Sequence, residues 1–177
     1  MSSLIVALVS VMVILAAMAG LVTGFTGTQA QLGESVKQSA ELYGDIKRTE
    51  LGSIAVSVLS AGARVDWSVR NEGQTELREF DKWDLLVVYQ DSPSAGLQVH
   101  RLTYTTNGTP SDGEWTVSGI YQDATLLVDE VFDPGIVNPG EEFIVRSQLD
   151  PAISTPTTNS LTLAVSNGVK ASAQFAN

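Results

Sequence analysis

The stretch MSSLIVALVSVMVILAAMAGLVTG, residues 1–24, is apolar throughout, and no charged side chain occurs before Glu34. About 20 such residues make a helix that spans the hydrocarbon core of a bilayer. A domain of the size that the remaining residues can build cannot enclose a helix of this kind. The sequence therefore predicts that this segment is buried in lipid or against copies of itself.

The beginning of the segment differs from a secretory signal in two respects. No Lys or Arg precedes the apolar run, and the run is longer than the roughly 7–15 apolar residues of a signal peptide. We therefore predict that Met1 is an unusual start or the first residue left after removal of a short basic leader. An ordinary single-span membrane anchor remains an alternative.

The apolar pattern continues beyond the first segment in a different form. Between Thr28 and Leu51 apolar residues recur every three to five positions with charged residues between them, which is typical of an amphipathic helix. Ala16, Gly20 and Gly24 lie four residues apart, a spacing that suits close packing of two helices. The residues that we expect to pack the helix during polymerisation are Leu4, Ile5, Leu8, Val11, Leu15, Ala16, Gly20 and Gly24.

The period of the sequence changes after Gly52. Short, β-branched or aromatic segments follow, separated by turn residues such as those of the Asn167-Gly168 hairpin signal. The expected strands are 53–60, 64–70, 84–90, 97–104, 114–121, 125–131, 142–149, 160–166 and 169–175. Strands at this spacing without helical intervals indicate an antiparallel sandwich.

Together these patterns predict an α+β protein. A long N-terminal α-helix would occupy residues 1–52, from about Ser3 to Leu51, and an antiparallel immunoglobulin-like β-sandwich would occupy residues 53–177. The expected contributors to the sandwich core are Trp67, Phe80, Trp83, Tyr89 and Phe143.

Composition narrows the classes of function. The formal net charge of -10 falls on residues 34–177 and disfavours nucleic acid, because phosphate binding requires a basic face. The chain has no cysteine, which excludes disulfides, thiol catalysis and cysteine metal sites. Its single histidine, His100, has no second histidine near it, so we expect neither a base nor a metal ligand there.

The remaining polar motifs do not indicate an enzyme. Carboxylates cluster in two regions, Asp81 to Asp91 and Asp129 to Asp133, where we expect solvated turns, with calcium between loops as an alternative. Phosphate-loop and GxSxG motifs are absent. We therefore predict no catalytic activity, no cofactor and no metal site. Asn107 lies in the one N-glycosylation sequon, Asn107-Gly108-Thr109, and is a possible glycan site.

Three segments carry a resemblance to a known family: VRNEGQT at residues 69–75, FDKWD at 80–84 and IVNPGE at 136–141. With the N-terminal apolar helix, they make the chain resemble archaellins, the type IV pilin-like filament subunits of the archaeal swimming organelle. The resemblance implies a helical homopolymer in an extracellular filament, built through the N-terminal helix with the sandwich outward.

The same resemblance implies the remaining partners. They are the cytoplasmic membrane, which holds the precursor, a prepilin-type peptidase that trims it, and the filament motor or platform. Two alternatives remain open: a membrane-anchored, stator-like accessory protein of the same machinery, and an adhesive type IV pilin. Ile5 weakens the pilin interpretation, because bacterial pilins usually carry an acidic residue at the fifth mature position.

Overall fold

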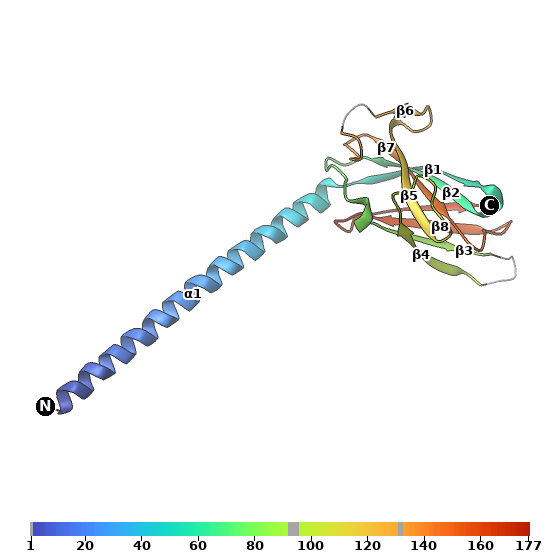
Figure 1. Ribbon diagram of the computed structural model, residues 1–177. Coiled ribbons are helices and arrows are strands. Elements are labelled where there is room, and N and C mark those ends of the chain that lie inside the picture. The colour runs from blue at the N-terminus through green and yellow to red at the C-terminus, as the bar shows by residue number, and fades with distance from the viewer. Residues whose placement is uncertain (1, 92–95, 131–132) are drawn as a thin grey trace. The chain divides into compact units, whose positions relative to one another are not determined.

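The computed structural model describes residues 2–91, 96–130 and 133–177, without the side chains of residues 2, 4, 6, 22–28 and 30. Contacts between residues divide the chain into two compact units, Met1–Gly44 and Asp45–Asn177. The first unit is helical. The second contains the end of the helix and the strands (Figure 1).

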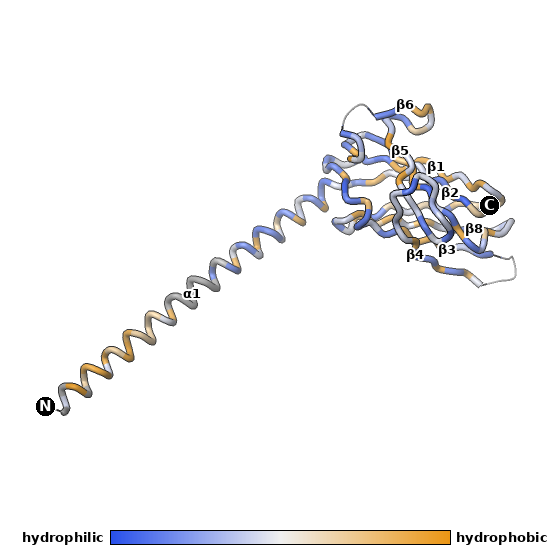
Figure 2. The backbone as a smooth tube through the Cα atoms, in the orientation of Figure 1, coloured by the Kyte–Doolittle hydropathy of each residue, from blue (hydrophilic) through white to orange (hydrophobic). Residues whose placement is uncertain are grey.

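Helix α1 spans Ser2–Arg48, and its hydropathy changes along its length. Figure 2 shows an apolar first half and a polar second half. The helix ends three residues before the predicted limit, because Thr49 caps it: the Thr49 hydroxyl donates to the Asp45 carbonyl oxygen at 2.8 Å. The same hydroxyl accepts a hydrogen bond from Asn167 Nδ2 at 2.7 Å, which ties the helix end to the turn before the last strand.

The described residues form nine strands and two short 3-10 turns. The strands are β1 Leu51–Leu59, β2 Arg64–Asn71, β3 Asp84–Tyr89, β4 Gln98–Tyr104, β5 Glu114–Asp123, β6 Val128–Asp129, β7 Glu142–Gln148, β8 Thr158–Ala164 and β9 Lys170–Ala176. The turns are η1 Ser60–Gly62 and η2 Phe80–Lys82. Eight strands follow the order β1-β2-β7-β5-β4-β3-β8-β9, and β6 pairs with β5.

The fold class predicted from the sequence is wrong. In place of an antiparallel immunoglobulin-like sandwich beside the helix, the strands form one nine-stranded sheet that dominates the structure. The sheet is nearly closed, because β1 and β9 approach each other. β4 and β5 pair in parallel, with Thr103 opposite Glu114 and Tyr104 opposite Trp115. Apolar alternation specifies which segments are strands, but it does not specify their partners or direction.

One predicted strand is much shorter than expected. Within residues 125–131 only Val128–Asp129 forms a strand, and residue 131 lies outside the described residues. The Asp123 side chain explains the difference: its Oδ1 accepts the N–H groups of Thr125 and Leu126, each at 2.9 Å, and so forms a turn. The hairpin signal at Asn167-Gly168 is confirmed, since it joins β8 to β9 and Gly168 has a φ of +85°.

The interior of the sheet holds most of the predicted core. Trp67, Tyr89 and Phe143 are fully buried, and Trp83 is 3% exposed. Phe80 is only partly buried and packs edge-on against Trp83, with ring centroids 4.8 Å apart. The prediction omitted Trp115, which is also fully buried.

Candidate assembly surfaces

The first half of α1 presents apolar side chains to its surroundings on every side. Ile5, Leu8, Val11 and Leu15 are each more than half exposed. Ala16 is exposed too, and a Cβ atom added at Gly20 would meet nothing within 4 Å. Leu4 and Gly24 belong to the helix, but their surroundings lie outside the described residues. The role of these eight residues in helix packing stays a prediction.

The second half of α1 carries a separate apolar stripe. Leu32, Val36 and Tyr43 are each at least 60% exposed, whereas the neighbouring Lys37 forms an ion pair with Glu41 within the helix at 4.0 Å. Within the described residues, no helix combines the length and the hydropathy needed to cross a membrane.

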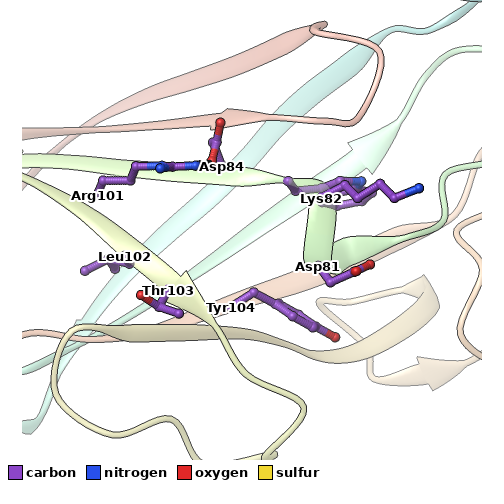
Figure 3. Close-up of a pocket in the computed structure, with 8 residues that line it drawn as sticks. Asp81, Lys82, Asp84, Arg101, Leu102, Thr103 and Tyr104 are labelled. Carbon is purple, nitrogen blue, oxygen red and sulfur yellow. Dashed lines mark hydrogen bonds and ion pairs between the residues drawn. The ribbon is translucent and has the colours of Figure 1, made fainter.

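An open hollow of about 370 Å³ lies beside η2 and β4. Its lining is drawn in Figure 3 and consists of Asp81, Lys82, Trp83, Asp84, Arg101, Leu102, Thr103 and Tyr104. It therefore contains most of the FDKWD segment, residues 80–84.

Three charged groups of this hollow, Lys82, Asp84 and Arg101, form ion pairs. Arg101 Nε donates to Asp84 Oδ1 at 2.9 Å. Lys82 Nζ donates to Glu79 Oε1 at 2.6 Å, and this hydrogen bond, together with the Glu79 charge, raises the pKa of Lys82. Burial raises the pKa of the Tyr104 hydroxyl, with a further contribution from Asp81. Each of these two shifts stabilises the protonated form that the group ordinarily has at neutral pH.

The sequence also singled out His100 and Asp91, and both contact neighbouring side chains in the structure. His100 Nε2 lies 3.4 Å from Gln98 Oε1, and its ring lies beside that of Tyr89 with centroids 5.2 Å apart. Asp91 accepts a hydrogen bond from Gln98 Nε2 at 3.1 Å. Across residues 2–91, 96–130 and 133–177, no three side chains of metal-binding type come together.

Asn107 is exposed in the turn between β4 and β5. Its backbone N–H donates to Thr105 Oγ1 at 3.3 Å, and a Cβ atom on the neighbouring Gly108 would meet nothing within 4 Å. The turn therefore leaves room for a sugar, and N-glycosylation at Asn107 stays a prediction.

Sequence reasoning missed a buried junction where two of the resemblance segments meet. Asn71 is fully buried, and its Nδ2 donates to the Thr75 carbonyl at 2.8 Å and the Val137 carbonyl at 3.2 Å. Its backbone N–H donates to the Glu141 carbonyl at 2.9 Å, and its carbonyl accepts from Gly140. The VRNEGQT and IVNPGE segments are thus two sides of one structural contact. In the sequence, Asn71 stands in a segment rich in turn residues, and an asparagine in such a segment is usually exposed. The sequence alone therefore does not indicate that Asn71 is buried.

Glu130 is a carboxylate whose environment disfavours its charge. Its Oε2 is buried and has no hydrogen-bond partner. Burial is the largest cause that raises the pKa of Glu130, and the charges of Glu141 and Asp133 add to it. Because the pKa is raised in the folded state, the folded protein binds the proton more tightly than the unfolded chain does. Stability therefore falls as the pH rises through this pKa.

We expect Glu130→Gln to stabilise the protein at pH 7, by less than about 1 kcal/mol because solvent screens a partly open group. At a pH below the carboxyl's unfolded pKa the gain should vanish, since both states are then protonated. Thermal unfolding at the two pH values measures the difference. Glu76→Gln is the control, because Glu76 is exposed and paired with Arg78. A gain that is equal at both pH values would contradict the explanation.

Comparison with known proteins gives structural likeness only. No family profile matches the chain, and no curated protein matches it in sequence. Among solved structures, the archaellum periplasmic stator protein FlaG from Sulfolobus acidocaldarius has a TM-score of 0.50 and 18% identity, covering 72% of this chain and 99% of that one. The FlaF and FlaG stator complex from the same organism has a TM-score of 0.49 and 17% identity, covering 72% of this chain and 89% of that one. The archaeal flagellum of Methanospirillum hungatei strain JF1 has a TM-score of 0.47 and 11% identity, covering 95% of this chain and 92% of that one.

These similar structures are all components of the archaeal swimming organelle. At 18% identity, the match to FlaG shows a shared fold and does not by itself assign a function.

Proposed function

We propose that the chain is an accessory, stator-like component of an archaellum-type machine at the cell surface. The observation that carries the proposal is the likeness to FlaG, which extends over 99% of that protein's structure. The matched 72% of this chain is about as large as the unit Asp45–Asn177. The sheet would contact other proteins of the machine, and the apolar first half of α1 would attach the sheet to the cell envelope.

The proposed role is mechanical and includes no catalysis and no cofactor. The hollow beside η2 supports this part of the proposal, because its Asp84 and Lys82 are engaged in ion pairs with Arg101 and Glu79. The proposed partners are other proteins of the same machine.

A second candidate function is the archaellin-like filament subunit, which would polymerise with itself after trimming by a prepilin-type peptidase. One observation favours it: α1 has the exposed second stripe of Leu32, Val36 and Tyr43. A simple attachment helix does not require such a stripe, whereas a helix packed along its length among identical helices does.

Replacing Leu32 and Val36 by serine distinguishes the two candidates. Our proposal predicts that cells carrying this double variant make as many filaments as the wild type, counted by negative-stain electron microscopy. Loss of filaments would support the filament-subunit candidate and contradict the accessory role. The matched control is Gln31→Ser with Gln38→Ser, two exposed polar positions of the same helix half.

A further inference from the structure

The turn between β5 and β6 carries a group of exposed apolar side chains. Leu126, Leu127 and Val128 are 72%, 64% and 44% exposed, and we call these three residues the apolar tip. The tip lies at the turn next to β6 in Figure 1, and Figure 2 shows its apolar character. Three consecutive apolar side chains open to water are unfavourable unless something covers them.

The turn holds the apolar tip in a fixed position. Asp123 Oδ1 accepts the N–H groups of Thr125 and Leu126, and Glu142 Oε2 accepts the N–H of Ala124 at 2.7 Å. Glu142 and Ala124 are both buried, so this last hydrogen bond anchors the base of the turn in the protein interior. A fixed turn lowers the entropy that binding would otherwise cost.

The backbone at Leu127 is in a conformation that does not favour leucine. Its φ is +54°, in the left-handed region where glycine or asparagine is preferred. Folding alone would be served better by a glycine at this position. A leucine that stays in a strained and exposed position points to a use for its side chain outside the folded unit.

The charges around the apolar tip favour one kind of partner. No Lys or Arg occurs from residue 102 to residue 145, and every charged residue in this range is acidic. Asp129 directly follows the tip and is exposed, and Asp123 precedes the tip by three residues. Anionic lipid and a second copy of this acidic chain would both be repelled, whereas a basic surface would be attracted.

We propose that the apolar tip docks into an apolar pocket rimmed by Lys or Arg on a different protein. The two leucines would fill the pocket, and the exposed Asp129 carboxylate would face its basic rim. The inference concerns a surface separate from α1, and it does not depend on the accessory role proposed above.

Site-specific photo-crosslinking in living source cells tests the proposal with the full chain. A photoreactive phenylalanine analogue replaces Leu126, and the crosslinked peptides are sequenced by mass spectrometry. We expect one other protein, crosslinked at an apolar segment that lies next to Lys or Arg. Crosslinks to a second copy of this chain, to lipid, or at no more than the level given by the same analogue at exposed Ser111 would overturn the proposal.

Two further variants separate docking from folding. Leu127→Gly removes the side chain and the backbone strain together, so we expect an unchanged or higher thermal midpoint and at least about tenfold fewer crosslinks from position 126. Asp129→Lys should also lower the crosslink yield, while Asp112→Lys, the same charge change on another exposed loop, should not. Undiminished crosslinking with Leu127→Gly, or an equal effect of the two charge reversals, would contradict the proposed pocket.

Discussion

Gly73→Ala is expected to lower the free energy of unfolding by about 3 kcal/mol. A Cβ atom at residue 73 would lie 2.4 Å from the Arg48 carbonyl oxygen and 2.5 Å from the Glu50 nitrogen. Both are backbone atoms, so a side-chain rotation cannot relieve the clash. The segment between the end of α1 and the start of β1 would have to move, although it is held by hydrogen bonds from Gly73 N–H to the Glu50 carbonyl and from Gln74 N–H to the Arg48 carbonyl.

Urea unfolding followed by tryptophan fluorescence measures this loss, because Trp67, Trp83 and Trp115 are all buried in the sheet. Gly108→Ala is the matched control, since a Cβ atom there would meet nothing within 4 Å. The control should unfold at the wild-type urea concentration. Equal urea midpoints for the two variants would show that the close approach at Gly73 does not constrain the segment between α1 and β1.

The second large effect is expected from Leu8→Asp combined with Leu15→Asp, which should release the chain from the cell envelope. Both leucines are more than 60% exposed in the single chain and lie in the apolar half of α1. An aspartate at the centre of an apolar helix costs about 3 kcal/mol in lipid, and an unpaired buried charge in a protein interface costs at least several kcal/mol. Two such changes cost about 6 kcal/mol in lipid, which is comparable to the favourable insertion free energy of the remaining apolar residues.

Quantitative blotting of the envelope fraction and the medium measures the release. The control is Gln29→Asp with Gln38→Asp, which adds the same two charges to exposed polar positions of the helix. We expect the control to stay in the envelope fraction. Retention of the leucine variant at the wild-type level would mean that the apolar half of α1 does not attach the chain.

The sequence predicted local structure better than the arrangement of the strands. In β2 the apolar residues Val65, Trp67 and Val69 alternate with polar ones, and the structure buries these three. The parallel contact of β4 with β5 left no comparable pattern, because only two residue pairs form it. Local periodicity depends on neighbouring residues, whereas strand order depends on contacts between residues far apart in the chain.

Among the candidate surfaces, too, some residues could be predicted from the sequence and others could not. Residues such as Ile5 and Leu8 could be proposed because a long apolar run is visible without a structure. Asn71 is buried against Val137, more than 60 residues further along the chain. Gly73 approaches Arg48 and Glu50, more than 20 residues before it. Neither contact could therefore be predicted from the spacing of residues in the sequence. The strained conformation of Leu127 was also inaccessible, since nothing in the sequence marks a leucine for a left-handed backbone.

Quantitative mass spectrometry of sheared filaments and of the cell envelope tests the accessory role most directly. Filaments are sheared from the source cells, and this chain is counted relative to the major filament protein in each fraction. We expect the chain to remain with the envelope and the sheared filaments to consist of a different protein. Finding this chain as the dominant protein of the sheared filaments would contradict the accessory role and favour the filament subunit.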